Sequence, residues 1–425
     1  MGEMVTTDRL LSGASALRGD AAPWAGSLRD GGRERFTQLG VPDRRKEAWK
    51  YSDLARALAH KAGAAPSPRA PLVLEDAFVA VFKDGVLDVA GSILPPGLMP
   101  LGMVLADPGS PFAGVLGSVN AAEQAAHPIV GLNTALMEEG FVLSLAAGDK
   151  LSAPLHVRFT WTGAASDRHV RLLVDLGEGA QATVLETHDG APAFSTVVNE
   201  VRLASNARLT HVRIDRLSAG ARQSAVTLGE VAGGAEYRAF CLSEGAAFCR
   251  HEALVALTGE SANVEIDGAF LVSGDNHCDN TTVISHISPN TTSRQAFRGV
   301  LSGRSHSAYQ GCVKVAEDAQ KTDAYQMSRA LLLSREARIA TKPELEIFAD
   351  DVKCSHGATA GEMDADALFF LRSRGIIEEE ARAMLVEAFL EEALDTIAAP
   401  TLRDVAASAV RDWLANHTAE VSHGG

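Results

Sequence analysis

A short turn signature recurs at a nearly constant spacing in the middle of this chain. Four stretches of small and polar residues each close on an alanine, and these alanines are 27, 28 and 27 residues apart. A regular spacing this short, in sequence rich in strand formers, is typical of coils stacked on coils. We therefore predict a right-handed parallel β-helix, or β-solenoid, in which each unit covers two successive coils. The four turns are 177–180, 204–207, 232–235 and 259–262.

After each turn, positions that carry similar residue types from one unit to the next alternate with positions that are mostly polar. This period of two is typical of a strand. A large β-sandwich is the alternative fold, because its strands also recur about every 8–12 residues. The regular spacing of the turns favours the solenoid. The pairs of positions that repeat in character are Ala182/Val184, Leu209/His211, Tyr237/Ala239 and Val264/Ile266.

Helical periodicity and turn composition divide the chain into four regions, with a β-helix core between helical ends. In the first region, Asp43 is expected to cap a helix over 44–60, and a Pro/Ala/Ser-rich linker follows at 62–71. The second region mixes short apolar runs with Gly/Pro turns, which indicates an α/β cap. The predicted fold class is therefore mainly β. The four regions are 1–62 (N-terminal helical), 72–139 (α/β cap), 140–361 (β-helix core) and 362–425 (C-terminal helical).

The C-terminal region shows start and stop signals for three helices. Asp364 is expected to cap the first helix, and Gly375 is expected to end it. A long helix over 378–399 is then stopped by Pro400, and a last helix covers 402–416. These boundaries predict a helical region that follows the last coil of the solenoid.

The long C-terminal helix carries two apolar stripes with an acidic face between them, which includes Glu387 and Glu391. One stripe suffices for packing against the chain's own core, so a second stripe indicates deep burial or a partner protein. A solvated acidic face remains the alternative interpretation of any single carboxylate. The first stripe is Ile377, Ala381, Met384, Leu385, Ala388 and Phe389, and the second is Val386, Leu390, Ala393, Leu394 and Ile397.

The charge balance excludes two classes of partner. The chain has 39 Lys and Arg against 54 Asp and Glu, a formal net charge of −15. A surface this acidic repels phosphate backbones and anionic lipid, so we expect no nucleic-acid or membrane binding. The N-terminus shows no secretory signal, and no run of about 18 apolar residues indicates a spanning helix.

The cysteines form neither a disulfide framework nor a zinc-finger or ferredoxin pattern, because they are odd in number, widely spaced and without a CxxC pair. We therefore expect reduced thiols in a cytoplasmic protein. Common catalytic signatures are also missing: there is no GxxxxGK[ST] loop, no HExxH motif and no GxSxG elbow. These absences favour a protein that is not itself an enzyme. The five cysteines are Cys241, Cys249, Cys278, Cys312 and Cys354.

A first cluster with metal-binding side chains covers 275–280, followed by His286. His277, Cys278 and Asp279 offer nitrogen, sulfur and oxygen donors, which suit iron or zinc. Adjacent residues on a strand point to opposite faces, however, so the three do not easily converge. We therefore favour a polar turn between coils over a metal site.

A second cluster contains Cys354 and His356, which are two residues apart. On an extended segment their side chains share one face, and they offer a thiolate and an imidazole to one metal or one partner surface. Two donors do not complete a four-ligand site, so the remaining donors come from elsewhere in this chain or from another subunit. The alternative is a small buried cysteine beside a hydrogen-bonded histidine.

The motif around Cys354 and His356 resembles the hallmark of the SufB/SufD family of iron–sulfur cluster assembly proteins. The hallmark run is 343–361 (PELEIFADDVKCSHGATAG), and 368–376 (LFFLRSRGI) fits the same pattern, as do two upstream runs. The N-terminal run 44–52 (RRKEAWKYS) resembles the SufD branch in particular. The upstream runs are 279–286 (DNTTVISH) and 293–301 (SRQAFRGVL).

The resemblance implies a non-catalytic scaffold subunit. It implies that the end of the β-helix pairs with a SufB homologue, that the C-terminal helical region binds the SufC ATPase, and that a transient Fe–S cluster is shared with the partner. The implied cluster ligand on this chain is His356, with Cys354 as the adjacent thiol of the motif. The expected partner-binding residues are Glu346, Phe348, Asp350 and Lys353 on a strand over 344–353 that pairs with the equivalent strand of a homologous subunit, and Glu387 and Glu391 for the ATPase.

Two other functions remain open from the sequence. A β-helical enzyme that acts on polysaccharide shares the architecture, and predicts secretion with a calcium-binding carboxylate cluster. A SufB-like cluster scaffold that acts as a homodimer shares the motif. Activity on acidic polysaccharides tests the first alternative, and the native mass of complexes purified from cells tests the second.

Overall fold

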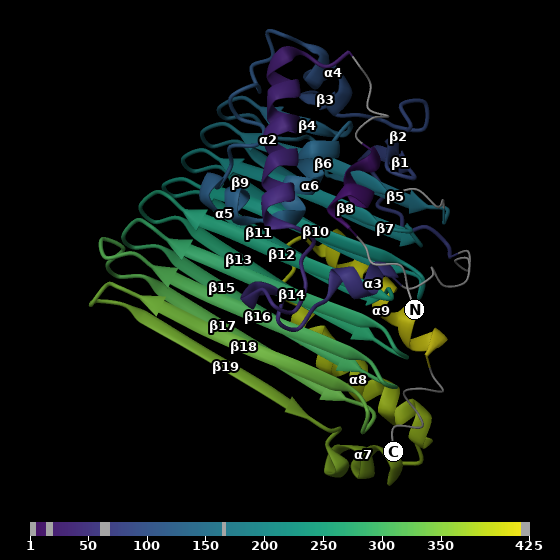
Figure 1. The fold of residues 1–425 in the computed structure, drawn as a ribbon. Coiled ribbons are helices and arrows are strands. Elements are labelled where there is room, and N and C mark those ends of the chain that lie inside the picture. Colours follow the sequence, from purple (N-terminus) through teal and green to yellow (C-terminus); the bar gives the residue numbers. More distant parts are fainter. Residues whose placement is uncertain (1–5, 14–19, 60–68, 164–166, 418–425) are drawn as a thin grey trace.

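The computed structural model describes residues 6–13, 20–59, 69–163 and 167–417. Its centre is a parallel β-solenoid of two facing sheets, in which the chain alternates from one sheet to the other (Figure 1). Each coil adds one strand to each sheet, and the strands from 139 onward form eight such coils in the described part of the chain. The predicted mainly β solenoid with helical ends is therefore confirmed.

Each sheet is named after its last strand. The β18 sheet contains β4 (Glu139–Leu145), β6 (Arg168–Leu176), β8 (Ser195–Leu203), β10 (Arg222–Val231), β12 (Phe248–Leu257), β14 (His277–His286), β16 (His306–Val315) and β18 (Arg338–Ile347). The β19 sheet contains β5 (Leu155–Trp161), β7 (Gln181–Gly190), β9 (Arg208–Leu217), β11 (Glu236–Gly245), β13 (Asn263–Val272), β15 (Thr292–Leu301), β17 (Asp323–Leu332) and β19 (Lys353–Gly361).

The repeat unit is one coil, so the expectation of two coils per unit is wrong. Leu209 pairs in register with Ala182 and with Tyr237, and Tyr237 pairs with Val264. The positions that repeat in the sequence are thus direct neighbours on adjacent strands. The unit is long because one coil contains two strands and two turns, and in these coils most strands have nine or ten residues.

The recurring turns let the coils stack closely. The residue before each closing alanine has a positive φ, as Gly179 (68°) and Asn206 (61°) do, and glycine and asparagine adopt this conformation at low cost. The four alanines are fully buried. A Cβ atom added to Gly259 meets the backbone nitrogen of Gly233 at 2.1 Å, which shows how near the neighbouring turn lies.

The N-terminal part covers the outer face of the β18 sheet. Phe36 of α2 (Pro23–Leu39) and the buried Trp49 pack in one apolar cluster with Val198 and Val226 of that sheet. Both sheets begin in this part, because β1 (Phe78–Lys83) pairs with β5 and β3 (Leu98–Pro100) pairs with β4. The other elements of this part are α1 (Thr7–Leu11), η2 (Glu47–Trp49), α3 (Leu54–Ala59), β2 (Val86–Leu87), α4 (Leu101–Ala106), α5 (Ala121–Ala126) and α6 (Pro128–Leu136).

The helix expected over 44–60 is not continuous. The chain forms the short η2 and α3 instead, and the carboxylate of Asp43 accepts a hydrogen bond from the backbone nitrogen of Arg45 at 2.9 Å. The break brings Trp49 under the guanidinium of Arg250 and places Ser52 within hydrogen-bonding distance of β14. Tertiary contacts with the β18 sheet therefore override the helical pattern. Most of the linker expected at 62–71, namely 62–68, lies outside the described residues.

Two C-terminal helices, α8 (Glu378–Leu394) and α9 (Pro400–Asn416), cover the outer face of the β19 sheet, and α7 (Ala365–Arg372), which has no buried residue, packs against α8. Asp364 caps α7 through two backbone nitrogens, and Gly375 has a φ of 88°, as the sequence predicts. The long helix ends at Leu394, earlier than expected, and Pro400 occupies the first turn of α9, where its missing N–H costs nothing. No helix in the described residues combines the length and apolar character needed to cross a bilayer.

Candidate functional site

The last coil leaves both sheets with a free edge. Strand β18 pairs with β16 and strand β19 pairs with β17, and each is the final strand of its sheet in the described part of the chain. Figure 1 shows these two strands at the lower edge of the solenoid, at the opposite end from α2 and α4. Most of their side chains are exposed or half-buried, in contrast to the preceding coils. Such an edge is a template for pairing with another chain.

Cys354 and His356 lie on the inward face of this last coil. Their register partners on β17 are Ala324 and Gln326, which are both buried inside the solenoid. The Cys354 side chain packs against the small apolar cluster that contains Ala324, whereas His356 is exposed. The two donors thus share a face on one strand and point into the open end of the solenoid. Burial raises the pKa of the Cys354 thiol, so it is protonated at neutral pH until a cation displaces the proton.

Polar side chains continue inward from His356. The amide nitrogen of Gln326 donates to the amide oxygen of Gln295 at 3.3 Å, and the hydroxyl of Thr282 donates to the same oxygen at 2.5 Å. A Cβ atom at Gly311 clashes with the amide of Gln326, so glycine is required for this packing. Buried, hydrogen-bonded polar groups therefore line the interior next to the open end of the solenoid.

The partner-binding residues expected at the solenoid end lie on the last coil, although the strand expected over 344–353 is wrong. Glu346 belongs to β18, Phe348 and Asp350 lie in the following turn, and Lys353 begins β19. The chain turns because Ala349 is buried in the core between the sheets. All four expected residues are exposed, and Phe348 retains 71% of its accessible surface, which is unusual for a phenylalanine.

The other two expected residues lie on α8, where Glu391 is exposed and Glu387 is half-buried. The second apolar stripe of this helix, which includes Val386 and Leu390, is buried against the β19 sheet. The first stripe is not buried throughout, because Ile377 and Met384 are exposed. The helical region therefore has an uncovered apolar surface. Sequence reasoning missed its two largest side chains, Phe369 and Phe370 of α7, although they lie in the recognised LFFLRSRGI run.

The cluster at 275–280 does not form a metal site, and the turn expected there is largely a strand. His277 and Asp279 lie on one face of β14, where the hydroxyl of Ser52 lies 2.8 Å from the imidazole and 2.5 Å from the carboxylate. Cys278 points to the opposite face, inside the solenoid, beside Cys249. The three donors thus diverge, as the alternation of side chains on a strand predicts.

Sequence reasoning missed a buried polar cluster in the middle of the solenoid. The carboxylate of Asp215, the thiol of Cys241 and the imidazole of His251 lie within 4.8 Å of one another between the two sheets. Burial lowers the pKa of His251, but the charges of Cys241 and Asp215 outweigh this effect and raise it to about 10. The available sequence signal was a second Cys-x-His spacing, Cys249 to His251.

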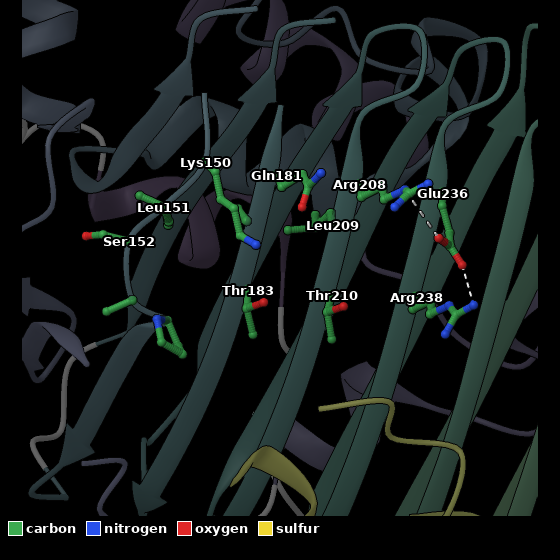
Figure 2. A pocket seen from close by; sticks show the side chains of 13 residues that line it. Lys150, Leu151, Ser152, Gln181, Thr183, Arg208, Leu209, Thr210, Glu236 and Arg238 are labelled. Atoms are coloured by element: carbon green, nitrogen blue, oxygen red, sulfur yellow. Dashed lines mark ion pairs between the residues drawn. The ribbon is translucent and has the colours of Figure 1, made fainter. Parts of the chain in front are cut away.

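A separate groove of about 390 Å³ crosses the starts of β7, β9 and β11 (Figure 2). Its charged residues include Lys150, Arg208, Glu236 and Arg238, and Glu236 forms ion pairs with both arginines. The groove has no thiol or imidazole among its lining residues. It therefore offers no ligand set for iron, in contrast to the end of the solenoid.

Comparisons with known proteins identify the family of this chain. The family described as "SUF system FeS cluster assembly, SufBD core domain" matches residues 159–389. The chain is 30% identical to the iron–sulfur cluster assembly protein SufD of Escherichia coli, over 86% of this chain and 87% of the relative. It is 31% identical to a SufBD family protein of Synechocystis sp., over 64% of this chain and 63% of the relative, and 26% identical to one of Mycobacterium leprae, over 64% and 71%. The matched residues contain the last coil with its Cys354 and His356, and the chain belongs to the SufBD family of iron–sulfur cluster assembly proteins.

Proposed function

We propose that this chain is a non-catalytic scaffold subunit of an iron–sulfur cluster assembly complex. It pairs with a SufB homologue through the last coil of the solenoid, and its C-terminal helices bind the SufC ATPase. His356 supplies a ligand to a nascent Fe–S cluster held between the two solenoids, and the cluster is cargo that leaves the complex. The observation that carries the proposal is the exposed His356 on a free edge strand. Family membership favours this role over the polysaccharide-active alternative.

The ligand set at the end of the solenoid is incomplete. In the described residues, the group of three or more close metal-binding side chains is Asp215, Cys241 and His251, and it does not include His356. Cys354 and His356 therefore offer two donors, whereas an Fe–S cluster is typically held by four protein ligands. A second solenoid that docks end to end against this one brings further donors to the same place, which explains why each subunit alone carries part of a site.

The last coil has the surface that such docking requires. Both edge strands have backbone groups without a strand partner, and Phe348 supplies an exposed aromatic side chain beside them. Aromatic side chains are enriched in the buried centres of interfaces. The charged Glu346, Asp350 and Lys353 surround this centre and suit the polar rim of an interface. A homodimer of this chain in isolation uses the same surface.

The ATPase contact is assigned to the C-terminal helices for a similar reason. Phe369, Phe370, Ile377 and Met384 are exposed although they are large and apolar. Contiguous exposed apolar residues are typical of protein interaction sites. This surface lies on α7 and the first half of α8, so one partner can bind there while another binds the last coil.

Co-expression with SufB and SufC homologues tests the ligand role. We expect His356→Ala to leave the complex assembled and to abolish the cluster that forms on it, measured as bound iron and acid-labile sulfide under anaerobic conditions. Ser355→Ala is the matched control, because Ser355 is also exposed but lies on the opposite face of β19. A full cluster on the His356→Ala complex rules out the ligand role.

A second variant separates the two contacts. Ile377→Asp places a charge in the exposed apolar surface of α8, and we expect it to release the ATPase while the SufB homologue stays bound. Phe348→Asp is expected to give the reverse result. Both are read by co-purification of the three chains. Loss of the same partner in both variants contradicts the assignment of two separate surfaces.

The compartment follows from the thiol chemistry. All five cysteines are free thiols. Free thiols persist in a reducing compartment, and a site that offers Cys354 to iron needs its thiol unoxidised. We therefore assign the complex to the cytoplasm, and fractionation of cells with an antibody against this chain tests that assignment.

A further inference from the structure

A set of metal-binding side chains lies deep inside the solenoid, well away from the last coil. Asp215 on β9 and Cys241 on β11 come from the β19 sheet, and His251 on β12 comes from the β18 sheet. Their donor atoms all lie within 4.8 Å of one another. Four strand spacings separate β11 from β19, so the set is roughly 19 Å from the terminal Cys354–His356 pair.

The alternation of side chains along the strands explains why these three residues meet. Asp215 lies at an inward position of β9, two residues before Leu217 of the inner core, while Val212 and Ile214 face the C-terminal helices. His251 likewise lies between inner-core positions of β12, Cys249 and Val255. Inward positions of facing sheets are the ones that approach each other across the interior. The donors are therefore held by two rigid sheets and not by a flexible loop.

The contacts of the set leave donor capacity unused. The Nε2 atom of His251 lies 2.9 Å from one carboxylate oxygen of Asp215 and 2.8 Å from the sulfur of Cys249. The other carboxylate oxygen of Asp215 is fully buried and has no hydrogen-bond partner among the described residues. A buried carboxylate oxygen without a partner is unfavourable, so its presence here points to a ligand that satisfies it.

A cavity of about 60 Å³ adjoins the set, and both Cys241 and His251 line it. Small side chains cause it: Thr227, Ala239 and Ala253 occupy inward positions where other coils have larger residues, and they are half-buried instead of fully buried. This volume holds an ion with one additional small ligand such as water. The set thus has an open coordination position that faces this cavity.

The charges around the set suit a cation. Arg213 donates to Asp215 at 3.1 Å and also forms an ion pair with the buried Glu186, so one arginine faces two carboxylates. His188 and His211 complete the hydrogen bonds of Glu186. With His251 neutral and Cys241 deprotonated, as metal binding requires, Asp215, Glu186 and Cys241 carry three negative charges against the single positive charge of Arg213, an excess that a divalent ion balances.

We propose that Asp215, Cys241 and His251 bind one divalent transition-metal ion of borderline softness, the class of Zn²⁺ and Fe²⁺. Mixed sulfur, nitrogen and oxygen donors select this class over Mg²⁺ and Ca²⁺, which prefer oxygen alone. Three protein ligands with an open fourth position are typical of exchangeable or reactive metal sites and not of closed structural ones. This site lies wholly within one chain and does not depend on the proposed cluster role of His356.

Cobalt(II) tests the proposal, because its thiolate complexes absorb strongly in the near ultraviolet and tetrahedral Co²⁺ absorbs in the visible. The full chain is loaded with Co²⁺ anaerobically in two ways, during expression and by prolonged incubation of the reduced protein. We expect about one Co²⁺ per chain after gel filtration, with both absorption features. Cys241→Ser and His251→Gln are each expected to lower the affinity at least about 100-fold, since loss of a direct ligand exceeds the 10–100-fold effect of a supporting residue.

Matched controls separate this site from other thiols and histidines. Cys312→Ser and His286→Gln alter a second cysteine and a second buried histidine outside the set, and Cys354→Ser alters the terminal pair. All three are expected to keep the cobalt spectrum.

Thermal unfolding shows whether each variant is folded. The proposal is overturned if the wild-type protein shows no thiolate absorption after both loadings. It is also overturned if a folded Cys241→Ser variant keeps the thiolate absorption. Loss of the spectrum in Cys354→Ser assigns the ion to the terminal pair and also overturns it.

Discussion

Two Cys-x-His pairs lie on inward strand faces of this solenoid, and their surroundings are opposite. Cys249 and His251 are on β12 in the middle, where both are buried: the Cys249 sulfur lies 2.8 Å from the His251 ring, which also contacts Asp215 of the facing sheet. Cys354 and His356 are on β19 at the end, where His356 is exposed and the next coil is missing. The spacing of two residues decides that each pair shares a face. The position along the stack decides whether its donors are already occupied by the same chain.

The comparison shows that inward polar residues in the middle of a solenoid contribute to stability, whereas those in its last coil are available for assembly with a partner. An inward polar residue in the middle is enclosed by neighbouring coils, so its partners come from the same chain or from a small ion held in the interior. The same residue type in the last coil is left for a second protein. Inward residues of the middle and residues of the last coil should therefore respond differently to mutation, acid and thiol reagents.

The largest expected effect is the loss of a buried charge in the middle. Arg213→Ala removes the guanidinium that binds Glu186, Asp215 and Gln223, and leaves two buried carboxylates without their cation. We expect the free energy of unfolding to fall by about 3–5 kcal/mol, measured by urea denaturation. Arg338→Ala on the exposed β18 is the control, with an expected change within about 0.5 kcal/mol. Equal losses in both variants contradict the contrast between middle and end.

Acid provides the second test. Burial lowers the pKa of the inward-facing His286 to about 4, and its neutral ring is within hydrogen-bonding distance of Thr291 and Ser293. Because the folded-state pKa is depressed below the ordinary value of 6.5, this stabilisation is complete above pH 6.5 and is lost as the pH falls through about 4. The loss amounts to about 3 kcal/mol at most.

Urea midpoints measured between pH 7 and pH 4.5 check this expectation. We expect the wild-type midpoint to fall more steeply than that of His286→Gln, in which the position no longer takes up a proton on unfolding. His356→Gln, at the exposed end, should keep the wild-type slope. Parallel pH profiles for all three proteins refute the role of the buried histidine.

Thiol reactivity gives a smaller effect. Cys354 is half-buried at the open end, whereas Cys249 and Cys278 are almost fully buried and react only when the solenoid opens. At pH 8 we expect a maleimide to modify Cys354 at least about 100 times faster than either buried thiol, a difference of about 2.7 kcal/mol. Peptide mapping by mass spectrometry identifies the modified residue. Docking of the SufB homologue is expected to protect Cys354, and an unchanged rate in the complex contradicts docking at this end.

The smallest expected effect is on stability at the end itself. His356→Ala removes an exposed side chain, so we expect the free energy of unfolding to change by less than about 0.5 kcal/mol. The same variant is expected to lose cluster assembly in the complex. Thermal and urea unfolding of the isolated chain measure the first expectation. A large destabilisation shows that His356 is part of the core and undermines its assignment as a ligand for a partner.

Much of the fold could be predicted from the amino-acid sequence. The spacing of Ala180, Ala207, Ala235 and Ala262 predicted a stacked solenoid, because a coil with the same turn must close after the same length of chain. Asp364 and Gly375 marked the ends of α7 for equally local reasons. The length of the unit was predicted correctly but the number of coils in it was not, because periodicity alone does not tell how many strands one coil contains.

The candidate site could be predicted from the sequence only in part. The pair Cys354 and His356 shares a face because of its spacing, which needs no tertiary information. Asp215 and His251 are far apart in the sequence and on different sheets, so no local pattern brings them together. Likewise, the break between η2 and α3 follows from contacts with Arg250 and β14 and not from helix propensity.

The sequence by itself determined which residues alternate inward along each strand and where each coil turns, because both depend on interactions between near neighbours. The tertiary structure alone decided which inward residues meet across the two sheets and which are left at a free edge. The physical reason is that burial depends on the next coil: His251 has one on either side, and His356 does not.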